Sequence, residues 1–140
     1  MKSILFIILI AVNVIAGNLE EAQNAIDSND YKRAFELLQP LSREGNNEAQ
    51  FLLANIYFYD KGTKEDIKTA FILYEKAAKQ NNAKAQLTLA IHYCYADKIK
   101  KDLKMCAYWA DQAKLNGKDV SRLWNHFELD KYFDKSIKVK

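Results

Sequence analysis

Helix-breaking residues are scarce in this sequence, which has one proline and four glycines among its 140 residues. Proline and glycine are the poorest helix formers, whereas alanine, leucine, lysine and glutamine, which recur along the chain, are among the best. The composition therefore favours helices over a β-sheet. Once a short N-terminal segment is set aside, the length is that of one domain.

Residues and motifs typical of catalysis are also scarce. The two histidines, His92 and His126, lie in no spacing typical of a metal site or of a nucleophile with its base, and we expect His92 to be a structural or surface residue. No glycine-rich phosphate loop, HExxH or GxSxG segment occurs. Asp66 and Asp102 stand at expected helix starts, where capping accounts for a carboxylate. We therefore expect no enzyme: no catalytic residue, no metal site and no cofactor.

Charge of one sign is not concentrated. The formal net charge is +3, and the signs are mixed except in the cluster from Lys98 to Lys104 and in the lysine-rich tail. A short basic segment of this kind is more often a solvated face than a binding patch. Nothing in the pattern indicates a nucleic acid partner.

A hydrophobic run of about 20 residues, which spanning a bilayer requires, is absent. The run from Ile4 to Ala16 is shorter, follows Lys2, and places Val14 and Ala16 at the −3 and −1 positions of a cleavage site. This layout is typical of a secretory signal peptide; the alternative, a buried N-terminal helix, would normally show a polar face. We predict a bacterial Sec-type signal peptide at 1–17, a single mature domain at 18–140 without stable membrane anchoring, and a periplasmic or secreted location.

Acidic, small and aromatic positions recur together when the sequence is laid over itself at an offset of 36 residues. Such self-similarity indicates a repeat protein. The recurring sets are Asp30, Asp66 and Asp102; Ala34, Ala70 and Cys106; Gly45, Asn81 and Gly117; Gln50 and Gln86; Tyr57 and Tyr93; and Tyr59 and Tyr95. We predict repeats at about 30–65, 66–101 and 102–127, the last of them partial.

Each unit is expected to hold two helices. From Asp66 to the residues just before Asn81, apolar side chains recur at spacings of three and four, and a second helix is expected from about Ala83 to Tyr95. Asn81, like the glycines of the other units, tolerates the left-handed conformation that ends a helix. Helical hairpins of this kind bury their apolar faces by stacking on their neighbours into a solenoid.

The chain from about Asp30 to Gly117 resembles the Sel1-like repeat family, whose 36-residue units are relatives of tetratricopeptide repeats. The resemblance implies an all-α fold, a right-handed α-α superhelix of antiparallel helix hairpins with about two and a half to three repeats. One departure is Lys98, which stands where the family has a loop glycine. The matching residues are Asp66, Ala70, Tyr74, Ala77, Ala78, Ala85, Gln86, Leu89, Ala90 and Tyr93, and Gly62 marks the first loop.

The flanks of the repeat region depart from the pattern. Upstream, Leu19 to Ser28 predicts a short helix, and Pro40 predicts a kink or local break in the first helix of unit one. After Gly117, Ser121-Arg122 replaces Ala-Gln, which is typical of a terminal cap, expected at about 118–136. The residues expected to cover the open end of the core are Trp124, Phe127, Leu129, Tyr132 and Phe133.

The implied function is an exported scaffold that binds another protein on the concave surface of the repeats. We expect this scaffold to be a monomer. An alternative is an immunity protein that neutralises an antibacterial toxin or effector in the periplasm. A less favoured alternative is β-lactam binding or hydrolysis, which is associated with relatives that carry a cysteine pair in every repeat. This chain has only two cysteines.

Four residues are the candidates for partner binding: Tyr59, Tyr95, Lys100 and Lys101. The two tyrosines recur one unit apart, and each lies two residues past a tyrosine expected in the core. On a helix that offset points to a different face. Packing within the loops and simple solvation are the alternatives for all four.

Cys94 and Cys106 could form a metal site, a redox pair or a structural disulfide. A metal needs more ligands than this segment offers, and a redox pair usually has CxxC spacing. In an oxidising compartment we expect a disulfide that closes the loop between two antiparallel helices, worth about 3 kcal/mol of stability. It would stabilise the loop that lacks its glycine.

Overall fold

The computed structural model describes residues 2–59, 66–96, 98–134 and 137, and in the first helix it describes the side chains of residues 4, 7 and 14 onward. Gly62 lies outside the described residues. Every regular element in the described ranges is helical. The elements are α1 (Lys2–Asp27), α2 (Tyr31–Arg43), α3 (Asn47–Phe58), α4 (Ile67–Lys79), α5 (Ala83–Tyr95), α6 (Leu103–Leu115), α7 (Ser121–Phe127) and the 3-10 turn η1 (Leu129–Lys131).

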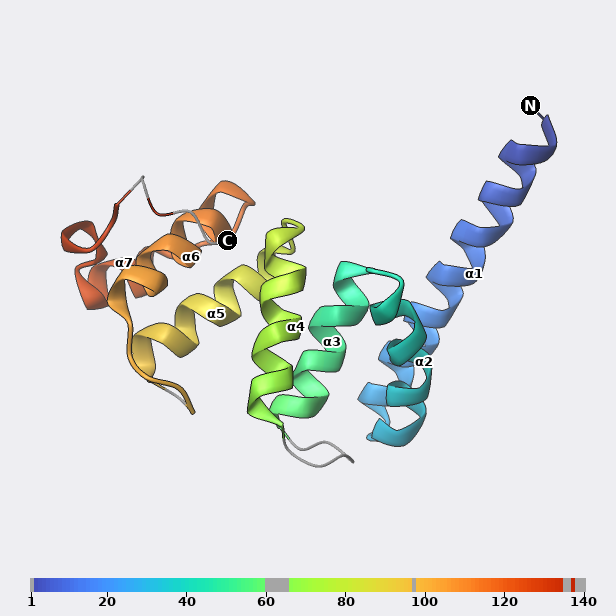
Figure 1. Cartoon of the computed structure of the whole chain (residues 1–140), viewed down its shortest axis with the longest axis horizontal. Coiled ribbons are helices and arrows are strands. Elements are labelled where there is room, and N and C mark those ends of the chain that lie inside the picture. The colour runs from blue at the N-terminus through green and yellow to red at the C-terminus, as the bar shows by residue number, and fades with distance from the viewer. Residues whose placement is uncertain (1, 60–65, 97, 135–136, 138–140) are drawn as a thin grey trace.

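Consecutive helices pack against one another from α1 to α6. Figure 1 shows them following one another along the long axis of the molecule, so that α1 and α7 lie at opposite ends of the array. This is the all-α solenoid of helical hairpins that the 36-residue period predicts.

The N-terminal helix is longer than predicted. The sequence favours a short helix from Leu19 to Ser28, but α1 runs without interruption from Lys2 to Asp27. The short helix is therefore the end of a longer one, because the apolar run before it contains no proline and only one glycine, Gly17.

The C-terminal half of α1 joins the core, where Ala22 and Ala25 are buried and Ile15, Leu19 and Ile26 are partly buried. The N-terminal part projects away from the other helices (Figure 1), and Ile4, Ile7 and Val14 are 63%, 65% and 56% exposed. Among the described residues, no helix combines the length and the hydrophobicity needed to cross a bilayer.

Side-chain caps explain why aspartates recur every 36 residues. Asp30 accepts a hydrogen bond from the backbone N–H of Arg33, and Asp66 accepts one from that of Thr69. Asp102 caps α6 in the same way. Each cap satisfies a backbone donor that the first turn of a helix leaves open. Asn46 and Asn82 do the same for the intervening helices α3 and α5.

Left-handed residues explain a second set of repeat positions. Gly45, Asn81 and Gly117 have φ values of 91°, 63° and 83°. Each follows the end of a helix, where the chain reverses toward the next one. Glycine and asparagine are the residues that adopt this conformation at least cost.

A buried amide ladder explains the recurring glutamines. Gln50 donates to the carbonyl oxygen of Ser42 at 3.2 Å and accepts from Gln80 at 2.8 Å. One repeat later, Gln86 donates to the carbonyl oxygen of Ala78 at 2.9 Å and accepts from Asn116 at 3.0 Å. Each glutamine thus joins the start of its own helix to the ends of the helices before and after it. Arg122 occupies the next equivalent position, so the ladder does not continue in the same form.

The prediction of a local break at Pro40 is wrong. Helix α2 continues through Pro40 to Arg43. Pro40 lies in the last turn, and its carbonyl still accepts a hydrogen bond from the N–H of Glu44. Proline removes the bond to the residue four positions earlier and crowds the carbonyl of that residue, and this is the sole proline of the helix. A single lost bond near a helix end is not enough to break it.

Alanines line the crossings between helices, and larger side chains fill the spaces around them. Ala54, Ala70 and Ala90 are fully buried, and such small residues let helix backbones approach closely. At the C-terminal end Trp109 is 1% exposed and Leu129 is fully buried. The aromatic rings of Trp124, Phe127 and Phe133 pack against this core, as expected of a cap, whereas Tyr132 is more exposed.

Candidate partner-binding surface

Tyr59 and Tyr95 occupy equivalent positions at the ends of α3 and α5. They are 56% and 57% exposed. The preceding tyrosines, Tyr57 and Tyr93, are partly buried against the core. The offset of two residues therefore turns the second tyrosine of each pair toward solvent.

The two tyrosines differ in their surroundings. Tyr95 stacks on the ring of His126, with centroids 6.1 Å apart, and meets Phe127 edge-on at 4.9 Å. Tyr59 meets Phe58 edge-on at 4.9 Å. Tyr95 thus belongs to an aromatic group that includes α7, while Tyr59 lies one repeat away.

Lysines of the loop between α5 and α6 reach toward both aromatic groups. The Nζ atom of Lys101 lies 5.1 Å from the centre of the Phe127 ring. Lys98 places its Nζ 4.8 Å from the centre of the Phe58 ring and donates a hydrogen bond to the Phe58 carbonyl oxygen at 3.1 Å. Cation–π contacts of this kind stabilise such an arrangement modestly. The loop therefore connects the surroundings of Tyr59 with those of Tyr95.

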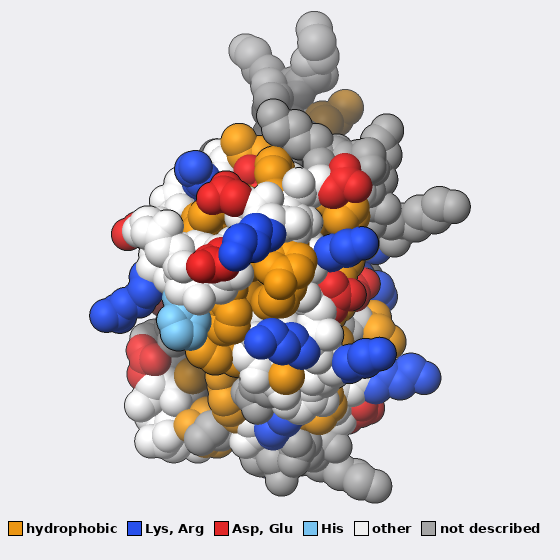
Figure 2. Space-filling model, turned by 90° about the vertical axis from the view of Figure 1, so that its left-hand side faces the viewer, with side chains coloured by type: hydrophobic (Ala, Val, Ile, Leu, Met, Phe, Trp, Pro, Cys, Tyr) orange, Lys and Arg blue, Asp and Glu red, His pale blue; other side chains and the backbone are white. Residues whose placement is uncertain are grey.

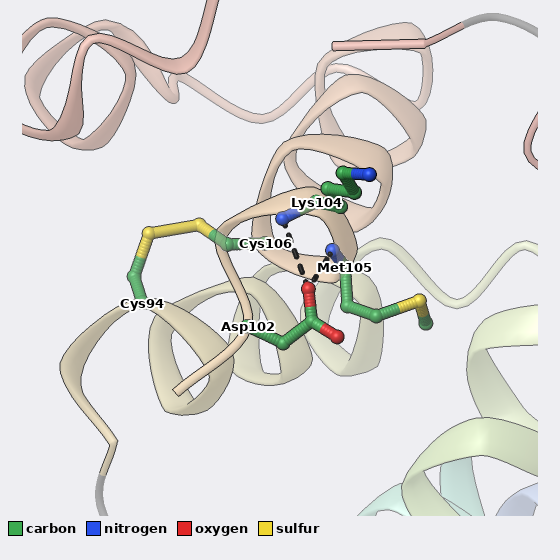
Figure 3. Close-up of a disulfide and its surroundings, with 5 residues drawn as sticks. All are labelled: Cys94, Asp102, Lys104, Met105 and Cys106. Carbon is green, nitrogen blue, oxygen red and sulfur yellow. Dashed lines mark hydrogen bonds between the residues drawn. A yellow bond between two sulfur atoms is a disulfide. The ribbon is translucent and has the colours of Figure 1, made fainter. Parts of the chain in front are cut away.

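The disulfide holds the two ends of this loop. Cys94 and Cys106 are joined, with their Cα atoms 5.3 Å apart, and both are fully buried. Figure 3 shows Cys94 near the end of α5 and Cys106 in the first turn of α6. Beside them, Asp102 accepts hydrogen bonds from the N–H groups of Lys104 and Met105, each at 3.0 Å. The disulfide predicted from the sequence is present.

The backbone of the loop is irregular, as the missing glycine predicts. Ala96 and Lys98 have φ values of 58° and 59°. This left-handed region is unfavourable for residues with a Cβ atom. Three linked features hold the loop in this conformation: the disulfide, the Asp102 cap and the contact of Lys98 with Phe58.

Two hollows flank the predicted binding residues. One, of about 390 Å³, lies between α4, α5 and the loop. We call it the loop hollow; it is lined by Phe71, Glu75, Tyr93, Ile99, Lys100, Lys101 and Asp102. The other, of about 400 Å³, lies beside Tyr59 and is lined mainly by α1 and α3.

Neighbouring side chains link three of the four predicted residues more directly than the fourth. Lys100 and Lys101 line the loop hollow, and Lys101 also reaches Phe127, which contacts Tyr95. Tyr59 contacts the buried ring of Phe58, near which the Nζ atom of Lys98 lies. We call Tyr59, Tyr95, Lys100 and Lys101 the tyrosine–lysine surface.

The end of the solenoid that carries α6 and α7 shows a band of hydrophobic side chains with lysines or arginines on its borders and a histidine at one margin (Figure 2). Lys114, whose Nζ lies 6.0 Å from the centre of the Trp124 ring, contributes to this mixture. Aromatic side chains are enriched at protein–protein interfaces, whereas lysines are depleted there relative to the rest of the surface.

His92 is a structural histidine. It is 4% exposed, and its ring centroid lies 4.3 Å from that of Phe58 and 5.5 Å from that of Phe71. Within the described part of the chain, no group of three or more acidic, histidine or cysteine side chains could hold a metal ion.

The pKa values of two tyrosines are shifted, and one of them, Tyr93, lines the loop hollow. Partial burial raises the pKa of the Tyr93 phenol, with smaller contributions from the carboxylates of Glu75 and Asp102. Burial likewise raises the pKa of Tyr74, whose hydroxyl donates to the Asn55 side chain at 2.7 Å. A tyrosine is protonated at neutral pH even at its usual pKa of about 10, and the Tyr74 hydroxyl acts as a hydrogen-bond donor from this buried position.

Sequence reasoning did not find Lys98, Phe71 and the aromatic partners on α7. One signal was available: the pair Phe71 and Tyr93, with ring centroids 6.2 Å apart, repeats the pair Phe35 and Tyr57 at 5.7 Å. Both members recur at the 36-residue offset. The α7 contacts carry no such signal, because the repeat pattern has ended there.

Stacked hairpins, repeated caps and a repeated glutamine ladder define the class: this is a helical-hairpin repeat protein. The family model of the Sel1 repeat matches residues 23–46, 47–82 and 83–118, and the chain belongs to this family. The matched units begin within α1 and at α3 and α5, whereas the units predicted from the sequence begin just before α2, α4 and α6, since a hairpin repeat can be divided at either turn. Sel1 repeats generally serve as scaffolds for protein–protein interaction.

Solved structures show the same fold. A protective antigen present in uropathogenic Escherichia coli strains, which displays an SLR fold, is 25% identical with a TM-score of 0.73; the match covers 86% of this chain and 27% of that one. A Sel1 repeat protein from Oxalobacter formigenes is 14% identical with a TM-score of 0.70, covering 88% and 53%. The chain thus spans about a quarter to a half of these structures. No protein with a curated function matches it.

Proposed function

We propose that this protein is an exported interaction module that binds another protein through the tyrosine–lysine surface and performs no catalysis. One observation carries the proposal: Tyr59 and Tyr95, one repeat apart, are exposed to the same degree. Large aromatic side chains that remain in solvent at matched positions are typical anchors for a partner. A folded repeat array holds them at a fixed spacing.

Export is supported by two separate features. A disulfide persists in oxidising compartments and is rare in the cytosol, and Cys94 and Cys106 are joined. The apolar N-terminal segment projects from the body (Figure 1), and the buried α1 residues, Ala22 and Ala25, lie beyond the expected cleavage site. Cleavage after Ala16 would leave them in place.

Partner capture from a periplasmic extract tests the binding surface. Tyr59→Ala with Tyr95→Ala should sharply reduce recovery of a specific partner. A matched control is Leu115→Ala, because Leu115 is a 72% exposed apolar residue outside the surface. Unchanged recovery with the tyrosine variant would contradict the proposal. The immunity role stays a prediction, and identification of the captured protein as a toxin would support it.

The mass of the exported chain tests localisation. We expect a periplasmic species that lacks the N-terminal signal peptide and has no free thiol under non-reducing conditions. A full-length chain confined to the cytosol, with two free thiols, would refute export.

A further inference from the structure

We propose that the loop hollow takes a large apolar side chain from an acidic segment of the partner protein, with its flanking carboxylates held by Lys100 and Lys101. This inference rests on the proposed function and adds the chemistry of the partner.

The shape of the hollow supports the apolar part of this ligand. Phe71, Tyr93 and Ile99 are each partly buried and line it together. Its volume of about 390 Å³ is at the low end for small-molecule sites. It therefore suits one side chain inserted from outside rather than a whole cofactor.

Charge complementarity supports the acidic part. Residues 98–104 include four lysines and one aspartate. That aspartate, Asp102, accepts two backbone hydrogen bonds at the start of α6. Its charge is thus directed at the helix N-terminus, where it is favourable. Lys100 and Lys101 are exposed at the rim, so the rim attracts carboxylates.

Glu75 sets the orientation of the ligand. It lies on the α4 wall of the hollow, opposite the loop that carries the lysines. Like charges in close contact are unfavourable, and unlike charges fix the register of a complex. The carboxylates of the bound segment should therefore lie on the loop side. The protonated Tyr93 hydroxyl can donate a hydrogen bond to the segment.

The disulfide supports preorganisation of this site. Ile99, Lys100 and Lys101 lie within the loop that Cys94 and Cys106 close. A loop already held in its binding conformation loses less entropy when a ligand binds. The disulfide thus holds in place the loop that lines one side of the hollow. In the preceding unit the position of Lys101 is occupied by Glu65.

The test uses an end-blocked synthetic peptide with a central phenylalanine flanked on each side by two glutamates, added to the isotope-labelled mature protein. We expect NMR shifts concentrated at Phe71, Tyr93, Lys100 and Lys101. Lys100→Glu with Lys101→Glu should weaken binding by about tenfold or more, since both rim charges are reversed. The same peptide with glutamines should bind correspondingly weakly.

A charge-matched control is Lys114→Glu with Lys118→Glu, because these lysines line a separate hollow between α6 and α7. It should leave peptide affinity within about twofold of the unmodified protein. Equal affinity for the glutamine peptide, or shifts located away from the loop hollow, would overturn the inference. Thermal unfolding of each variant shows whether it is folded.

Partner capture separates this inference from the proposed function. If the tyrosine variant loses the partner while Lys100→Glu with Lys101→Glu retains it, the proposed function stands and the acidic ligand is refuted. If the peptide binds the loop hollow but neither variant affects partner recovery, the surface is not the one that the partner uses, and the proposed function falls.

Discussion

The two internal hairpins, α3 with α4 and α5 with α6, follow the same backbone plan but are closed by different chemistry. In both, the N–H of the capping aspartate donates to a tyrosine carbonyl: Asp66 to Tyr57 at 3.4 Å and Asp102 to Tyr93 at 3.0 Å. At the next position after these tyrosines, the first hairpin has Phe58 and the second has Cys94.

Phe58 is 1% exposed and packs against Phe71, Tyr74 and His92. Cys94 is bonded to Cys106, and the residue equivalent to Cys106 in the first hairpin is Ala70. One repeat thus fixes the end of its hairpin by burying an aromatic ring, and the next by a covalent bond. The second solution needs no large side chain and leaves a loop that carries exposed lysines.

Loss of the buried ring should have the largest effect. We expect Phe58→Ala to lower the free energy of unfolding by about 3–5 kcal/mol, because it removes buried apolar surface and leaves a cavity. Urea unfolding followed by circular dichroism measures this. Tyr59→Ala, next to it and 56% exposed, is the control and should change stability by less than about 0.5 kcal/mol. Equal effects of the two variants would show that the first hairpin is not held by Phe58.

Removal of the disulfide should have the next largest effect. Cys94→Ala with Cys106→Ala should lower the free energy of unfolding by about 3 kcal/mol, mainly because the unfolded chain gains conformational freedom. Denaturant unfolding with and without a reductant measures it. Reductant should destabilise the unmodified protein and leave the double variant unchanged. If neither removal nor reduction of the disulfide changes the free energy of unfolding, the loop is held by its other contacts, and the two hairpins do not differ in the way described.

The glutamine ladder should show where the two hairpins are alike. Gln86→Ala leaves the carbonyl of Ala78 and the side-chain amide of Asn116 without their buried partner. The free energy of unfolding should therefore fall by about 1–3 kcal/mol. Gln50→Ala is the matched variant one repeat earlier and should cost about the same. A large difference in the urea midpoints would show that the equivalence of the hairpins does not extend beyond the backbone.

Most of the fold could be predicted because its determinants are local and repeat. Asp66 at a helix start, Asn81 at a helix end and alanines at crossings each indicate structure through nearby residues, and the 36-residue offset shows that they belong together. Helix α5 has the predicted bounds. The full length of α1 was missed because its apolar run was taken to be a separate segment.

The candidate surface was predictable only in part. Tyr59 and Tyr95 follow from the repeat, but their neighbours do not. Lys98 contacts Phe58 across 40 positions of sequence, and Tyr95 meets Phe127 on a helix outside the pattern. Such contacts depend on how far a loop reaches and where a cap folds back. Neither is encoded in a local spacing.

The smallest expected effect concerns the left-handed turn at Ala96, two residues before Lys98, which stands at the position of the missing glycine. Ala96 has a φ of 58°, and its Cβ atom makes this conformation unfavourable. Ala96→Gly removes that strain but gives the unfolded chain more freedom, so we expect a net gain of up to about 1 kcal/mol in the free energy of unfolding. An increase in the urea midpoint without a change in slope would show it.

Ala83→Gly at the start of α5 is the control. It should destabilise the protein, because the backbone at Ala83 is helical and glycine is a poor helix former. If Ala96→Gly also destabilises, the left-handed turn at Ala96 is no source of strain, and the disulfide stabilises this hairpin without compensating for strain at this residue.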